Sequence, residues 1–369
     1  MITNGDNECL KELSEESLLS FNDLVGKTPF SFFKDFTHPV VIFKYYEEFT
    51  DRLINDICST THQKFETNFE YLVNPNINAG CRLKDGKNKI FVYEGTILSL
   101  YAYSSVLSCS YNTISANVDT SKYHIVHNMD IEMQYANYPS ITTSLLVSSI
   151  PEENVIAEYI AMIAIKFVIL HEIGHILSGH LLYRHKRGEI IASFYMSETN
   201  SSITDNLDLQ TMEIDADSFA ICQILSLLET ELLEDQLLLQ TVKDIPEIYK
   251  IIGCAIQCVF YLIGILNNQW FVDYPSSCSH PPALTRVNLI LDTCRNTISG
   301  KDADKKYGYI LQGIIMAQKN LCDYFNKDFH NPEQFVLDVI GKNEYGIMLI
   351  KRWRDLKKEI LCYTALPSV

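Results

Sequence analysis

The sequence has few positive charges for its length. Its 369 residues include 30 Lys and Arg against 46 Asp and Glu, which gives a formal net charge of −16 at pH 7. A protein that binds DNA or RNA needs a concentrated basic face. The basic clusters here are short, at residues 184–187 and 351–358, and the first directly precedes Gly188, as is typical of a helix end. The composition therefore argues against a nucleic-acid partner.

The cysteines show no paired spacing, and the start of the sequence does not predict a leader. Its 11 cysteines are scattered, and its first 20 residues are acidic and polar, unlike a secretory or mitochondrial signal. An odd number of cysteines without a leader indicates free thiols in a reducing compartment, so we expect a cytoplasmic protein. Cys254 and Cys258, four apart in an apolar segment, are expected to be small buried residues rather than metal ligands.

No apolar run reaches the length of about 20 residues that a membrane-spanning helix needs. The longest are residues 155–170, which contain Glu158 and Lys166, and residues 251–266, which contain Gln257. We expect both to be core helices, which argues against membrane integration.

The remaining pattern is that of a helix-rich globular protein, with 47% hydrophobic and 21% charged residues and neither an internal repeat nor a long linker. Turn-forming residues at 74–89 predict a hairpin or loop, and residues 90–108 predict a strand that leads into a helix. Helices dominate from Pro151 onward. Residues 197–210 are expected to form a loop.

One apolar stretch contains an unusual group of polar residues. Residues 166–181, KFVILHEIGHILSGHL, place His171, Glu172, His175 and His180 among Ile, Val and Leu. Burying polar groups is costly unless they are paired. These side chains therefore need protein partners or a bound ion.

The spacing of the first three residues favours the ion. His171 and His175 are four residues apart, so both rings lie on one helix face and can turn a nitrogen toward one metal. Glu172 lies one step round the helix, where it can reach a water on that metal. Two zinc ligands and a general base have this pattern. His180, five residues after His175, is expected to face away from the histidine pair and to be a structural histidine.

A third ligand is available downstream, where Glu213 and Asp217 are also four residues apart. Glu213 can complete a three-ligand zinc site. Asp217 can accept a hydrogen bond from the far ring nitrogen of a ligand, with His171 as the expected partner. The alternative is an ordinary acidic helix start.

The stretch SHPPALTR, residues 279–286, contains a further candidate, His280. It could lie over the open metal position and stabilise the oxyanion of a tetrahedral intermediate. Arg286 could anchor this loop to a nearby carboxylate. The alternative is an ordinary helix start, because Pro281 and Pro282 suit the first turn.

Together, the stretches HEIGH, EIDAD and HPPALTR resemble the gluzincin metallopeptidases of the HtpX and CAAX-prenyl-protease type. They resemble still more closely the bacterial Lit family of phage-exclusion peptidases, as does the segment at 89–108. The resemblance covers about residues 85–295. A longer stretch between the first two motifs and a C-terminal extension of helices depart from the family pattern.

The resemblance implies one Zn²⁺ per chain, held by His171, His175 and Glu213, with Glu172 as general base and His280 as oxyanion partner. We expect an α+β, predominantly helical, zincin-like fold with a small β-sheet preceding the zinc helix. The expected organisation is an N-terminal region (1–84) packed on the core, a peptidase core (85–295) and a C-terminal helical extension (296–369).

The predicted function is hydrolysis of peptide bonds by a cytoplasmic zinc endopeptidase. The resemblance implies a role in phage defence, with a phage-derived activator and a host protein, such as a translation factor, as substrate. One alternative is a membrane-associated quality-control protease of the HtpX type. Another is a non-catalytic zinc sensor, in which His280 or Cys278 would supply a fourth ligand.

Overall fold

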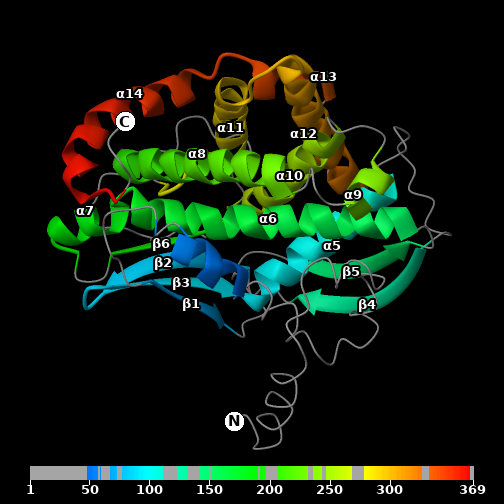
Figure 1. Cartoon of the computed structure of the whole chain (residues 1–369), viewed down its shortest axis with the longest axis horizontal. Helices are drawn as coiled ribbons and strands as arrows, with labels where there is room; N and C mark the ends of the chain where they lie inside the picture. Colours follow the sequence, from blue (N-terminus) through cyan, green and yellow to red (C-terminus); the bar gives the residue numbers. More distant parts are fainter. Residues whose placement is uncertain are drawn as a thin grey trace, which may run out of the picture.

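The computed structural model shows a mostly helical protein with a small mixed sheet, which confirms the predicted α+β fold class (Figure 1). The acidic first 20 residues lie outside the part of the chain that the structure describes. The described residues are 48–56, 59, 67–72, 77–110, 123–131, 141–148, 151–189, 192–196, 206–231, 236–242, 247–267, 278–325 and 332–365.

The main sheet has four strands in the order β1-β3-β2-β6. Its strands are β1 (Thr67–Leu72), β2 (Ala79–Lys84), β3 (Lys87–Tyr93) and β6 (Ala192–Tyr195). β1 is parallel to β3, and the other neighbours are antiparallel. β2 and β3 form the hairpin predicted at 74–89, with Asp85 and Gly86 at positive φ (53° and 76°), as a two-residue hairpin turn requires.

Three of the four strands precede the histidine helix, as expected, and β6 follows it. The strand–helix transition predicted at 90–108 is confirmed, because α5 (Glu94–Ser110) continues directly from β3. Residues 116–140 have no clear periodicity in the sequence, so no element can be predicted there. The structure forms an antiparallel pair there and just beyond, β4 (Tyr123–Ile131) and β5 (Ile141–Ser148).

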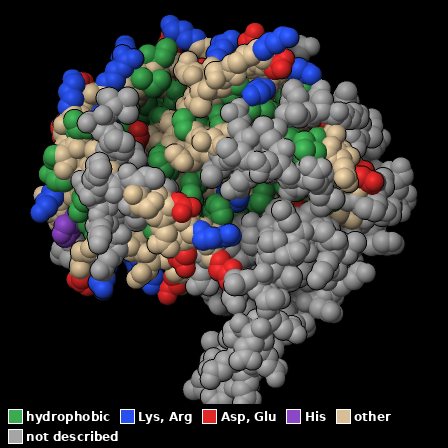
Figure 2. Space-filling view, in the orientation of Figure 1, with side chains coloured by type: hydrophobic (Ala, Val, Ile, Leu, Met, Phe, Trp, Pro, Cys, Tyr) green, Lys and Arg blue, Asp and Glu red, His purple; other side chains and the backbone are tan. Residues whose placement is uncertain are grey.

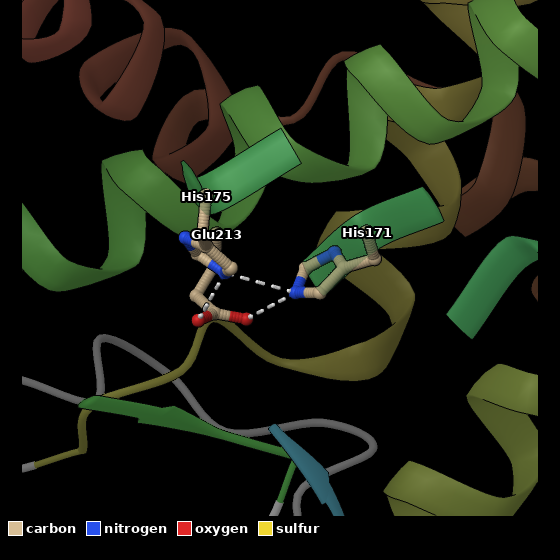
Figure 3. A group of neighbouring side chains, drawn as sticks. All are labelled: His171, His175 and Glu213. Carbon is tan, nitrogen blue, oxygen red and sulfur yellow. Dashed lines mark hydrogen bonds and ion pairs between the residues drawn. The ribbon is translucent and has the colours of Figure 1, made fainter. Parts of the chain in front are cut away.

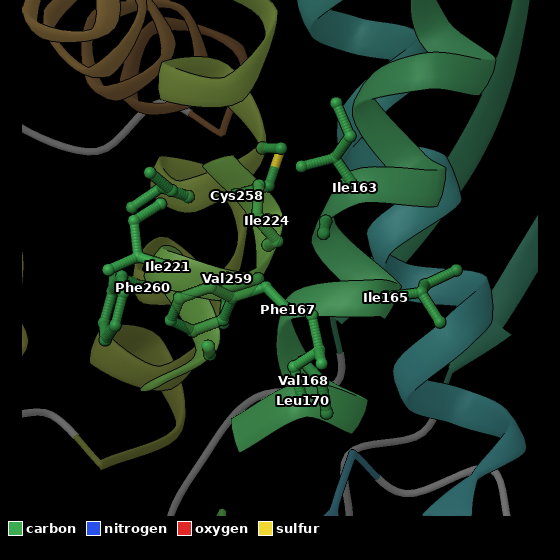
Figure 4. Packing of buried hydrophobic residues seen from close by; sticks show 14 of the residues in the cluster. Ile163, Ile165, Phe167, Val168, Leu170, Ile221, Ile224, Cys258, Val259 and Phe260 are labelled. Carbon is green, nitrogen blue, oxygen red and sulfur yellow. The ribbon is translucent and has the colours of Figure 1, made fainter. Parts of the chain in front are cut away.

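The histidine motif lies on the central helix α6 (Pro151–Leu177), which runs between the four-stranded sheet and α8 (Asn206–Glu231) (Figure 1). α10 (Glu247–Asn267) packs against α6. In Figure 4, Phe167 of α6 lies against Phe260 of α10, with ring centroids 5.7 Å apart in an edge-on arrangement. The helix that carries the motif is thus fixed in the core.

Both long apolar segments are core helices. By length and composition, α6 and α10 could each cross a membrane, but the apolar window of each is entirely buried inside the protein. Cys254 and Cys258 on α10 are free thiols with no exposed surface, as expected for small buried residues.

Further helices of the described residues surround this core. They are α7 (His180–Lys186), α9 (Gln236–Thr241), α11 (Ala283–Thr297), α12 (Ala303–Tyr324), α13 (Pro332–Ile340) and α14 (Glu344–Ile360), followed by a short 3₁₀ turn, η2 (Leu361–Tyr363). α14 packs on α8 and α11 and presents exposed Lys351, Arg354, Lys357 and Lys358. Figure 2 shows Lys and Arg side chains along this edge of the molecule.

The domain boundaries expected after residues 84 and 295 stay a prediction.

The loop expected at 197–210 is wrong for its last five residues, because α8 begins at Asn206. Their polar side chains have tertiary partners that a local reading cannot foresee. Asp208 is 1% exposed and accepts a hydrogen bond from Nε of Arg352 on α14 at 2.6 Å, while Leu209 enters the core. Residues 197–205 lie outside the described residues.

Candidate metal centre

Two small residues bring the histidine helix and the acidic helix together. A Cβ atom added to Gly174 would lie 3.2 Å from Cα of Ala216 and 3.2 Å from Cδ1 of Phe219. Gly174 lies within HEIGH and Ala216 within EIDAD, so a close approach of α6 and α8 falls inside both motifs. This approach carries Glu213 up to the two histidines.

The three predicted ligands meet at one point (Figure 3). The Nε2 atoms of His171 and His175 are 3.1 Å apart. The Glu213 carboxylate closes the triangle, with Oε2 at 3.4 Å from Nε2 of His171 and Oε1 at 3.3 Å from Nε2 of His175. All three residues are buried, so water does not compete freely for these atoms.

This geometry fits a metal ion with tetrahedral ligands. Ligand atoms about 2.1 Å from a tetrahedral zinc lie roughly 3.4 Å from one another, and the three separations are 3.1, 3.4 and 3.3 Å. Two imidazole nitrogens and one carboxylate are also a known donor set for a catalytic zinc site. The cluster of His171, His175 and Glu213 could therefore hold a metal ion.

The orientation of His171 is fixed from behind by Asp217. Nδ1 of His171 lies 2.9 Å from Oδ1 of Asp217. Arg286 of α11 donates to both oxygens of the same carboxylate, from Nε and Nη2 at 2.7 Å each. Proton donation from Nδ1 of His171 to Asp217 turns Nε2 toward the cluster, where it is the nitrogen that can bind a metal. Arg286 thus anchors the HPPALTR stretch to a carboxylate of α8.

The electrostatics of the cluster favour a positive charge at its centre. Burial opposes ionisation of Glu213, but the charge on His280 and hydrogen bonds from His171 and His175 hold the pKa of its carboxyl well below the usual range. Burial likewise lowers the pKa of His171, but the carboxylates of Asp217 and Glu213 outweigh it and raise that pKa to about 10. Burial keeps the pKa of His175 well below its usual value.

Glu172 lies beside the cluster rather than in it. Its side chain is 2% exposed, and burial raises the pKa of its carboxyl to about 7. A hydrogen bond with the buried thiol of Cys81 on β2 acts in the opposite direction. Among the described residues, its Oε2 atom has no hydrogen-bond partner. A buried carboxylate with a pKa near neutrality and an available oxygen can act as a general base toward a water.

His280 borders the cluster from the loop that precedes α11. Its Nε2 atom lies 3.6 Å from Oε2 of Glu213, and its Nδ1 atom lies 2.9 Å from Oγ of Ser279. Neither His280 nor Cys278 belongs to the group of ligand atoms within 4.8 Å of one another. His280 is 3% exposed, so it faces the site rather than solvent. Pro282 is also the N-cap of α11, so this stretch does begin a helix.

The expectation that His180 faces away from the histidine pair is wrong. α6 ends at Leu177, and Gly179 adopts a left-handed conformation (φ 80°) that turns the chain before α7 begins at His180. Nδ1 of His180 consequently lies 3.0 Å from Nδ1 of His175. Counting positions along one continuous helix could not predict this contact.

Several further residues around the site escaped the sequence reasoning. Phe194 of β6 stacks on the His175 ring, with centroids 3.8 Å apart and planes at 15°. Trp353 of α14 meets the His180 ring edge-on at 5.6 Å. Asp215, between Glu213 and Asp217 in EIDAD, lies 3.5 Å from Nε2 of His180. Only Asp215 carried a signal in the sequence, because it lies within a motif already singled out.

The C-terminal segment completes the end of the histidine helix. The backbone amide of Ala365 and the hydroxyl of Thr364 both donate to the carbonyl oxygen of Leu177, at 2.8 and 3.0 Å. Terminal carbonyls of a helix need such partners. The C-terminal extension therefore buttresses the site, although its residues lie far away in the sequence.

Comparison with known families agrees with this site. The family model described as Peptidase U49 matches residues 108–306, which is more than half of the chain. The protein belongs to this peptidase family. The match to Peptidase U49 spans all three motifs and ends near the start of α12, so α13 and α14 lie beyond it. No curated protein and no solved structure matches the chain.

Proposed function

We propose that this member of the Peptidase U49 family is a zinc-dependent endopeptidase. The observation that carries the proposal is the placement of Glu172 next to the buried triangle of His171, His175 and Glu213. The triangle offers three protein ligands, and a catalytic zinc needs three together with one open position. A purely structural zinc usually has four protein ligands.

The side chains divide the work of peptide hydrolysis. Zinc, when bound by His171, His175 and Glu213, supplies a Lewis acid that polarises a carbonyl and acidifies a water. Glu172 takes a proton from the attacking water and delivers it to the leaving amine, a role that suits a carboxyl whose pKa burial raises to about 7. His280 donates from Nε2 to the oxygen of the scissile carbonyl as negative charge develops there.

Two residues keep this arrangement in place. Asp217 holds His171 through Nδ1 at 2.9 Å, and Arg286 holds Asp217 with two hydrogen bonds. Such supporting residues commonly contribute 10–100-fold to metal affinity or activity, roughly. His171 has the most exposed side chain of the three proposed ligands, at 11% against 0% for His175 and 3% for Glu213. The side of the cluster at His171 is the one nearest to solvent.

The biological role is proposed from the resemblance to the Lit family. We propose a cytoplasmic phage-defence protease, activated by a phage-derived molecule, that cleaves a host protein such as a translation factor. The same resemblance assigns one Zn²⁺ to each chain. A peptidase with this role must be silent at rest, because uncontrolled cleavage of a translation factor would harm the cell.

The test combines metal analysis with a search for cleaved proteins. Purified wild-type protein should contain close to one zinc per chain by elemental analysis. Cell lysate incubated with it should gain new protein N-termini that are absent when a chelator is present. If cleavage needs the infection signal, lysate from phage-infected cells supplies it.

Two variants make the test specific. His175→Ala should lose both the zinc and the new termini. His185→Ala is the matched control, because His185 lies on the neighbouring helix α7, is exposed and binds the backbone of Glu189 rather than the cluster. Wild-type protein that neither contains zinc nor takes it up when added would contradict the proposal.

A further inference from the structure

The two ring nitrogens of His175 have different neighbours. Nε2 lies at the proposed metal position, 3.1 Å from Nε2 of His171, whereas Nδ1 lies 3.0 Å from Nδ1 of His180. His180 has no exposed surface, and its own Nε2 lies 3.5 Å from Oδ2 of Asp215. Asp215 in turn accepts a hydrogen bond from Oγ of Ser178 at 2.6 Å. A chain of contacts therefore runs from the cluster to a carboxylate of α8.

The order of protons along this chain follows from metal binding. A histidine that binds a metal through Nε2 must be neutral and carry its proton on Nδ1. His175 then donates to Nδ1 of His180, so this atom of His180 must be bare. A neutral His180 consequently carries its proton on Nε2, which lies 3.5 Å from Oδ2 of Asp215, a contact with the carboxylate charge rather than a hydrogen bond. The opposite tautomer of His180 would donate to His175 and force a proton onto the metal-facing nitrogen.

The surroundings hold both rings in this geometry. Phe194 stacks on the His175 ring and also lies 6.0 Å from the His180 ring. Trp353 of α14 meets the His180 ring edge-on, with ring centroids 5.6 Å apart. Gly179 can adopt its left-handed conformation at little cost because it lacks a Cβ atom, and an added Cβ would lie 2.6 Å from the backbone of Tyr363. The turn that presents His180 to His175 is thus sterically fixed.

We propose that His180 is a positioning residue for His175 and that Asp215 sets the tautomer of His180. The inference rests on the proposed function, since it takes His175 to be a metal ligand. It gives the two ligand histidines different supports. His171 donates directly to the Asp217 carboxylate, whereas His175 donates to a second histidine that is itself faced by the Asp215 carboxylate.

The test measures Zn²⁺ binding to the metal-free protein by competition with a coloured chelator. His180→Leu removes the acceptor and should weaken Zn²⁺ binding by roughly 10–100-fold, the usual effect of losing a hydrogen-bond partner of a metal ligand. His180→Asn keeps an oxygen that can accept from Nδ1 of His175 and should recover most of that loss. The absorption spectrum of bound Co²⁺ should change in His180→Leu and return toward wild type in His180→Asn.

His185→Leu is the matched control. His185 is an exposed histidine of α7 that binds the backbone of Glu189 rather than the cluster, so this variant should bind Zn²⁺ like the wild type. The melting temperature of each metal-free variant shows whether the fold persists. If His180→Leu does not fold, Asp215→Ala tests the inference instead. The Asp215 side chain is 21% exposed, so its removal should disturb the fold less, and Zn²⁺ binding should still weaken.

Three results would overturn the inference. The first is a His180→Leu protein that binds Zn²⁺ as tightly as the wild type. The second is a His180→Asn protein that binds Zn²⁺ as weakly as His180→Leu does. The third applies if His180→Leu does not fold, and is a folded Asp215→Ala protein with wild-type Zn²⁺ affinity. Failure of the wild type to bind Zn²⁺ would instead defeat the proposed function. The two failures are therefore distinguishable.

Discussion

Asp217 accepts a hydrogen bond from Nδ1 of His171 at 2.9 Å while Arg286 donates to both of its carboxylate oxygens. All three residues are buried, and they come from α6, α8 and α11. The charge of Arg286 and the hydrogen bonds to the carboxylate outweigh burial and keep the pKa of Asp217 below its usual value. The contact therefore orients a proposed metal ligand and also joins three helices.

The first prediction concerns Asp217→Asn. The amide keeps the size of the side chain but loses the charge that faces His171, so Zn²⁺ affinity should fall by roughly 10–100-fold. Chelator competition measures the change. Asp208→Asn is the matched control, because Asp208 is an equally buried carboxylate of α8 that pairs with Arg352 away from the cluster. Equal Zn²⁺ affinity in the two variants would reduce Asp217 to a purely structural carboxylate.

The second prediction is a pH dependence of metal binding. Without a metal, the carboxylates of Asp217 and Glu213 raise the pKa of His171 to about 10 despite burial, so its ring is protonated at neutral pH. Zn²⁺ must displace this proton, so affinity should rise with pH by roughly tenfold per unit below that pKa. Calorimetry in buffers of different ionisation enthalpy should record the release of at least one proton per Zn²⁺. Binding without proton release would contradict this account of the cluster.

The third prediction separates the two roles open to His280. Because Nε2 of His280 lies 3.6 Å from Glu213 and outside the ligand group, His280→Ala should leave zinc bound. Loss of one oxyanion donor should lower kcat by about 10²–10³. Elemental analysis and turnover of a mapped cleavage site measure the two quantities. Loss of zinc from this variant would make His280 a ligand and favour the zinc-sensor alternative.

The fourth prediction tests the close approach of α6 and α8. Gly174→Val places branched methyl groups where even a Cβ would lie 3.2 Å from Ala216 and Phe219. Such overpacking typically costs about 1–3 kcal/mol, and displacement of α8 should also move Glu213 and weaken Zn²⁺ binding. Gly308→Val on α12 is the control, since nothing lies within 4 Å of its added Cβ. Unchanged Zn²⁺ affinity in Gly174→Val would show that the approach does not position Glu213.

The local parts of the site can be predicted from the sequence because helical spacing is a local property. Residues four apart share a helix face, so the spacing alone pairs His171 with His175 and Glu213 with Asp217. A single contact between the two helices, α6 and α8, is then enough to bring the two pairs together. The strand–helix transition at 90–108 and the hairpin at Asp85 and Gly86 are local in the same sense.

The parts that escaped depend on contacts between distant residues. The Ala365 amide and the Thr364 hydroxyl reach Leu177 from the far end of the chain, and Trp353 reaches His180. The left-handed conformation of Gly179 turns the chain after α6, so that His180 contacts Nδ1 of His175, a proposed ligand. The start of α8 resembles a loop in sequence because Arg352 of α14, which donates a hydrogen bond to the buried carboxylate of Asp208, lies far away in the sequence.

The most direct test of the central claim is Glu172→Gln, compared with the wild type for both zinc content and proteolysis. Glutamine has the size of glutamate but cannot take a proton at neutral pH, so the fold and the three ligands should persist with about one zinc per chain. Proton transfer by a positioned side chain contributes about 10²–10⁴ in rate, so the new N-termini seen in lysate with the wild type should be nearly absent. A Glu172→Gln protein that retains zinc and cleaves the same sites at near wild-type rate would contradict the account.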